Sequence, residues 1–156
     1  MDDRQDNLGY PIHVTGTRRA DHPVVVGYHG SDSSRRALAY AAGTARRLHR
    51  PMLVVYVLPA VRVAPVAGQV IRPTEDRHET VRWLTAELDQ VLGRHCPEAG
   101  VCLRQGTPFR QLAAAAREHH ADALVLGAYR SWWHGAARSF PERLARHAAC
   151  PVIVVP

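Results

Sequence analysis

Four short apolar runs, separated by longer segments with helical periodicity, constrain most strongly how this chain can fold. The runs are VVVG at 24–27, MLVVYVL at 52–58, ALVLG at 123–127 and VIVV at 152–155. Continuous apolar runs of this length are typical of strands that are buried on both faces, as in parallel sheets. VCLRQG at 101–106 alternates in a strand-like way and predicts a fifth strand.

The segments between these runs predict four helices, at about residues 35–49, 74–95, 108–120 and 141–147. On the first helix five apolar residues are expected to face the core: Leu38, Ala41, Ala42, Ala45 and Leu48. Its N-cap is expected at Asp32 or Ser33, and Thr107 with Pro108 is expected to start the third helix. Strands that alternate with helices pair in parallel through right-handed crossovers. The sequence therefore predicts an α/β fold, a doubly wound five-stranded parallel sheet with helices on both faces.

The length of 156 residues fits one domain with its own core. Residues 1–21 are polar and lack periodicity, so we expect a flexible leader followed by a domain over residues 22–156. Residues 59–73 contain three prolines and one glycine and are expected to form a loop.

The charged residues narrow the chemistry that this chain can perform. Lysine is absent, and all 20 residues in the combined lysine and arginine count are arginine. A P-loop lysine, a Schiff base and lysine acid–base catalysis are therefore excluded. The net charge of +6 favours polyanions in principle, but the acidic residues are scattered among the arginines. No basic motif with interleaved aromatic residues is present, so a nucleic-acid partner is not expected.

Three further features of the sequence bear on the cellular compartment of the protein. No apolar run reaches the roughly 18 residues that a membrane span needs, so no membrane association is expected. The N-terminal segment lacks the basic flank and apolar core of a secretory signal. Cys96, Cys102 and Cys150 are odd in number and lack metal-ligand spacing, and we interpret them as small buried apolar residues. A cytoplasmic protein without a metal site is the resulting expectation.

Three segments carry a resemblance to a known family. VVVGYHGSDSSRRAL, LRQGTPFRQLAAAAREHHADALVLGAYR and ERLARHAACPVIVV resemble the first strand and turn, the third helix with the fourth strand, and the closing helix and strand of the universal stress protein family. The resemblance covers roughly residues 23–156. It implies a sheet of order 3-2-1-4-5 and a homodimer that forms through the edge strand at residues 152–155.

Many members of this family bind ATP through a G-x-x-G-x9-G-S/T pattern and an Asp at the end of the first strand. By resemblance, eight residues of this chain occupy the corresponding positions: His29, Gly30, Ser31, Val57, Gly127, Arg130, Arg138 and Ser139. Gly127 matches the first glycine, whereas Arg130 and Arg138 stand at the second and third. His29 stands at the position of the Asp, and Val57 at the position whose backbone meets the adenine.

These departures change the expected chemistry of the site. Glycine lets backbone N–H groups touch phosphate oxygens, and an arginine side chain at either position closes that approach. We therefore expect a stress-response regulatory module without catalytic residues and without ATP bound in the usual mode. One alternative is a nucleotide-binding protein, for ATP or AMP, in which Arg130 and Arg138 replace the glycine contacts and hold an anionic small molecule. A weak ATP-using phosphohydrolase is the other alternative.

Overall fold

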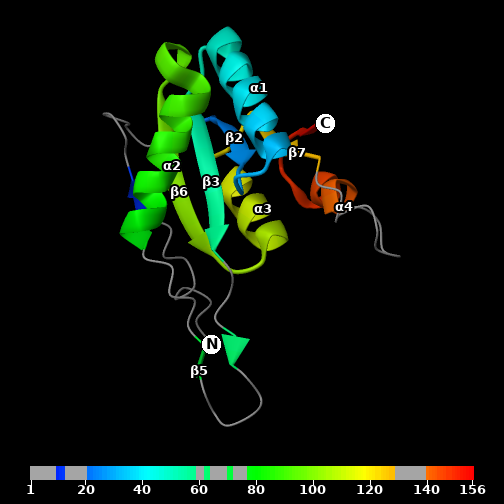
Figure 1. Cartoon of the computed structure of the whole chain (residues 1–156). Helices are drawn as coiled ribbons and strands as arrows, with labels where there is room; N and C mark the ends of the chain where they lie inside the picture. The colour runs from blue at the N-terminus through cyan, green and yellow to red at the C-terminus, as the bar shows by residue number, and fades with distance from the viewer. Residues whose placement is uncertain (1–9, 13–20, 59–61, 64–69, 72–76, 129–139) are drawn as a thin grey trace.

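The computed structural model describes residues 10–12, 21–58, 62–63, 70–71, 77–128 and 140–156 (Figure 1). Its main sheet has six strands in the order β1-β6-β3-β2-β7-β8. The strands are β1 (Tyr10–Ile12), β2 (Val24–Gly27), β3 (Met52–Leu58), β6 (Ala99–Gln105), β7 (Ala123–Gly127) and β8 (Val152–Val155). The last five of these pair in parallel. Numbered among themselves they run 3-2-1-4-5, so the predicted doubly wound sheet is confirmed.

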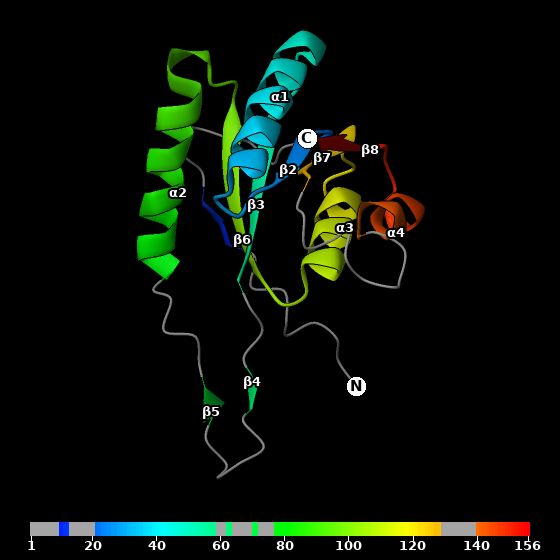
Figure 2. The ribbon, with the colours of Figure 1, turned by 45° about the vertical axis from the view of Figure 1, so that its right-hand side comes forward.

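In the described part of the chain, four α-helices cover the sheet, two on each face (Figure 2). They are α1 (Asp32–Leu48), α2 (Arg77–Leu92), α3 (Pro108–Glu118) and α4 (Phe140–His147), and a short 3-10 turn, η1 (Gly93–His95), follows α2. Helices α1 and α2 pack on one face, whereas α3 and α4 pack on the other.

The two faces explain why the strands are continuously apolar. In β2, Val24 and Val26 point toward α1 and α2, and Val25 points toward α3. All three side chains are fully buried. Each contributes roughly 1.5–3 kcal/mol of transfer free energy, so a polar residue at any of the three would cost stability.

Two strand pairs lie in segments for which no strand was expected. Within the predicted leader, β1 pairs antiparallel with β6, with Tyr10 opposite Leu103 and Ile12 opposite Val101. Without β1 the strand β6 would be a sheet edge with unpaired backbone groups, and pairing removes that exposure. Within the predicted loop, β4 (Arg62–Val63) and β5 (Val70–Ile71) form a two-stranded hairpin.

At α1 the structure corrects two details. The N-cap is Ser31, one residue before Asp32 and two before Ser33, because its Oγ accepts a hydrogen bond from the Ser34 N–H at 3.2 Å. Leu48, expected in the core, is 50% exposed. The helix ends at Leu48, and the left-handed His49, with φ 51°, caps it, so Ala45 is the last residue of α1 in the core.

The expectation of buried thiols holds for one cysteine. Cys102 on β6 is buried, whereas Cys150 is half-buried and Cys96 is exposed. All three are free thiols. Among the described residues, no helix combines the length and the apolar character needed to cross a membrane.

Candidate functional site

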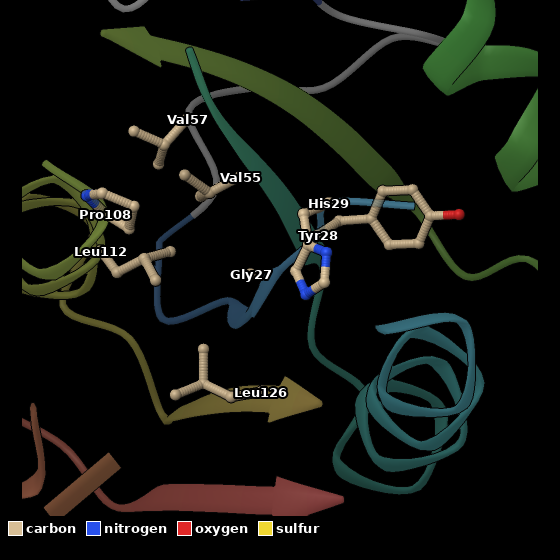
Figure 3. Close-up of a pocket in the computed structure, with 8 residues that line it drawn as sticks. All are labelled: Gly27, Tyr28, His29, Val55, Val57, Pro108, Leu112 and Leu126. Carbon is tan, nitrogen blue, oxygen red and sulfur yellow. The ribbon is translucent and has the colours of Figure 1, made fainter. Parts of the chain in front are cut away.

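A cavity of about 280 Å³ opens at the carboxyl ends of β2 and β3, beneath the first turns of α3 (Figure 3). Eight residues line it: Gly27, Tyr28, His29, Val55, Val57, Pro108, Leu112 and Leu126. The aliphatic side chains point into this space, while the Tyr28 ring points away from it (Figure 3). Ligands of open α/β sheets bind at this edge, so the cavity is the candidate site.

The walls of the cavity are apolar, and its size is close to the lower end of small-molecule sites. Gly27 keeps the floor open at the point where β2 ends. A Cβ on Gly27 would lie 2.9 Å from Leu126 Cδ2 and 3.2 Å from Leu112 Cδ2. Such walls suit an apolar or aromatic group, such as a nucleobase, better than a charged one.

The turn between β2 and α1 supplies the polar rim. Gly30 has φ +87°, a conformation that other residues rarely adopt, and it directs the chain from the strand into the helix. The Ser31 Oγ lies 3.3 Å from His29 Nε2 and 3.1 Å from Ser33 Oγ. Partial burial lowers the pKa of His29, so its imidazole is neutral at pH 7. A neutral imidazole offers one donor and one acceptor, and the hydroxyl of Ser31 lies within hydrogen-bond distance of it.

Gly127 has a packing role that the resemblance did not indicate. It ends β7 directly against the first turn of α1, and a Cβ there would come within 2.5–2.6 Å of the backbone of Ser33 and Ser34. The missing side chain therefore allows strand and helix to pack closely. A phosphate contact at Gly127 stays a prediction.

Of the eight predicted site residues, His29 and Val57 line the cavity, and Gly30 and Ser31 form the adjoining turn. Gly127 lies behind the same turn. Arg130, Arg138 and Ser139 lie outside the described residues. Sequence reasoning missed four wall residues, Val55, Pro108, Leu112 and Leu126. Pro108 was recognisable, because a proline that starts a helix after a parallel strand stands at the ligand edge.

Sequence reasoning also missed a partly buried polar network beneath the turn, in which Tyr28 and Glu87 are buried and Arg35 is exposed. The Tyr28 hydroxyl donates to Glu87 of α2, and Arg35 of α1 donates to the same carboxylate through Nε at 3.0 Å and Nη2 at 3.2 Å. Burial, together with the hydrogen bond to Glu87, raises the pKa of Tyr28 to about 12. The Arg35 hydrogen bond holds the pKa of Glu87 below its usual range. The network ties both helices to the residue next to His29.

Fold and site together define a doubly wound α/β domain with a small-ligand crevice at the carboxyl edge of its sheet. The chain belongs to the universal stress protein family, whose model matches residues 22–156. A universal stress protein from Thermus aquaticus, described as lying in the QAH/OAS sulfhydrylase 3' region, is 30% identical over 140 residues, covering 85% of this chain and 96% of that one.

Solved structures share the fold. UspA from Lactobacillus plantarum superimposes with a TM-score of 0.65 at 19% identity, over 88% of this chain and 99% of its own. A universal stress protein from Archaeoglobus fulgidus in complex with dAMP gives a TM-score of 0.60 at 23% identity, over 86% and 98% of the two chains. At these identities the likeness establishes the fold alone.

Proposed function

We propose that this chain is a regulatory stress-response module that binds a small ligand in the carboxyl-edge cavity and is not an enzyme. The observation that carries the proposal is the combination of apolar walls with a single neutral imidazole at the rim. The other ionisable lining residue, Tyr28, points its ring away from the cavity and keeps its proton to about pH 12. Binding needs no more than these groups. The serine hydroxyl nearest to His29, that of Ser31, caps α1 by accepting the Ser34 N–H at 3.2 Å, so we assign it to the helix start rather than to catalysis.

The residues at the family's ATP-binding positions argue against the binding of ATP in the family's usual mode. His29 stands where the family pattern has an Asp, and a neutral imidazole replaces a charged acceptor. The substitutions at Arg130 and Arg138 remove glycine approaches to phosphate. Each lost charge-assisted hydrogen bond costs about 1.5–3 kcal/mol, so two losses weaken binding by roughly a hundredfold or more.

An adenine nucleotide with one phosphate is the second candidate ligand. The Archaeoglobus fulgidus protein of the same fold is in complex with dAMP. A base could occupy the apolar cavity here while Arg130 and Arg138 meet a single phosphate group by guanidinium forks.

Calorimetry on the full chain with ATP, AMP and dAMP separates these candidates. We expect no dissociation constant for ATP at or below a few micromolar, and nucleotide should not co-purify with the protein. Tight ATP binding would refute the proposal. A preference for AMP that disappears in the double variant Arg130→Ala with Arg138→Ala would establish the second candidate. Phosphate release from ATP that exceeds a His29→Ala control would refute the non-enzymatic assignment.

The proposed assembly is a homodimer in the cytoplasm. Support for the dimer comes from β8, which ends the sheet order and is half-buried along its length. An apolar edge strand of this kind presents backbone groups that a symmetric copy can pair. Three free thiols support a reducing compartment.

A further inference from the structure

A second hollow lies far from the cavity, between the carboxyl-terminal halves of α1 and α2, which run side by side (Figure 1). It is an open groove of about 320 Å³. Its lining residues are Ala39, Ala42, Gly43 and Arg46 from α1 with Val91, Leu92 and His95 from α2 and the turn after it. The α1 residues are spaced as one helix face, so the groove follows the helix axis.

The floor of this groove is apolar, and its depth depends on Gly43. Ala42 and Leu92 form buried parts of the floor. Glycine inside a helix lowers helix stability relative to alanine, so a structural reason for Gly43 is expected. A Cβ on Gly43 would meet only the end of the Arg47 side chain, at 3.3 Å, whereas a Cβ on Gly127 would strike backbone. Packing therefore does not require this glycine, and its effect is to keep the groove open.

Cationic groups surround the apolar floor. Arg46 Nη1 donates to the His95 carbonyl at 3.4 Å, which holds the guanidinium across one end of the groove. Arg47 lies over Gly43 and donates to Thr44 Oγ1 at 3.0 Å. Within the described part of the chain, neither arginine is paired with a carboxylate. The last carbonyls of α1 carry partial negative charge, but two full positive charges outweigh them.

We infer that this groove binds a small amphipathic anion, a carboxylate on an apolar chain or ring. The apolar part would cover Ala42 and Leu92 beside Gly43, and the carboxylate would meet the Arg46 guanidinium, whose planar fork matches carboxylate geometry. The site is separate from the carboxyl-edge cavity and does not depend on what that cavity binds.

Amide NMR of the full chain with octanoate tests the assignment, because the glycine signals report the two sites independently. Octanoate should shift the Gly43 resonance and leave Gly27 and Gly30 in place. 1-Octanol, which has the same chain length without the charge, should bind at least tenfold more weakly. Comparison with 3-phenylpropanoate distinguishes a chain from a ring as the apolar part.

Two variants sharpen the test without endangering the fold. Gly43→Leu fills the groove while improving helix propensity, and it should abolish octanoate binding. Arg46→Gln should weaken binding about tenfold, whereas the matched variant Arg110→Gln, an exposed arginine on α3, should leave it unchanged. Three results would each overturn the inference: shifts at Gly27 and Gly30 instead, unchanged binding in Gly43→Leu, or equal binding of octanol. Shifts at Gly43 that follow protein concentration alone would assign the groove to a second copy and also overturn it.

Discussion

Gly43 and Gly127 differ in the atoms that surround them. Gly127 abuts the backbone of Ser33 and Ser34, whereas Gly43 faces a groove and the end of one flexible side chain. The same substitution should therefore have opposite effects. Gly127→Ala should lower the free energy of unfolding by about 2 kcal/mol or more, because neither strand nor helix can yield. Gly43→Ala should raise it by about 0.5–1 kcal/mol. Urea unfolding measures both, and equal effects would contradict this account.

The hydroxyl of Tyr28 makes a second residue-scale prediction. It donates to the buried Glu87 carboxylate, and hydrogen bonds to charged groups are the more stabilising kind. Tyr28→Phe should lower the free energy of unfolding by about 1.5 kcal/mol. Tyr40→Phe, at a position that is 44% exposed, is the matched control and should change it by less than about 0.5 kcal/mol. Equal losses would show that the network contributes nothing.

Glu87 should make stability depend on pH in the acid range. Its pKa in the folded protein is held below the usual value of 4.5, first by Arg35 and then by Tyr28. The carboxylate therefore stabilises the fold at pH above about 4.5, and this contribution is lost as the pH falls through the lower folded pKa. The stability difference between wild type and Glu87→Gln should shrink over that interval. Asp89→Asn, at an exposed position on the same helix, is the control for the loss of one carboxylate. A difference that stays constant down to complete unfolding would refute the assignment.

At the scale of elements, β1 is the least secure part of the sheet. It contributes three residues, and Pro11 in its centre has no N–H to donate. Removal of residues 1–20 should leave a cooperatively folded domain and lower its stability by no more than about 3 kcal/mol, the value of a few backbone hydrogen bonds. Amide exchange should accelerate at Val101 and Leu103, which pair with β1, and stay slow at Leu124. Loss of folding would make β1 an integral strand.

The elements also show what could be predicted from the sequence and what could not. Buried parallel strands such as Met52–Leu58 were predictable to the residue, because a seven-residue apolar run rich in valine and flanked by prolines is typical of a strand buried on both faces. β1 was not predictable, since three residues show no period and depend on the edge that β6 offers. Site residues that follow a strand, such as His29, were predictable from topology. Glu87, which reaches Tyr28 from another element, was not predictable, because its position depends on how the helices pack.

At the scale of the whole molecule the sheet is asymmetric. One edge of the parallel sheet is covered by β1, whereas among the described residues β8 pairs with β7 alone. The carbonyl of Pro151 accepts a hydrogen bond from Leu124 of β7 at 2.9 Å, and that of Val155 accepts one at 2.7 Å from Ala128, which follows β7. Because backbone groups alternate along a strand, those of Val152 and Val154 point outward. The part of the chain that the structure describes thus offers one open edge for assembly, at the opposite end of the sheet from β1.

This geometry gives a sharp test of the proposed dimer. Val154→Pro removes an outward N–H without touching the hydrogen bonds to β7, and proline is tolerated in edge strands. The variant should be monomeric by light scattering, because one donor is lost from each side of a symmetric pair. Val154→Ala keeps the donor while shortening the side chain, and it should remain dimeric. If wild type and Val154→Pro have the same mass at high micromolar concentration, the copies do not assemble through β8, and the open edge must be protected in some other way.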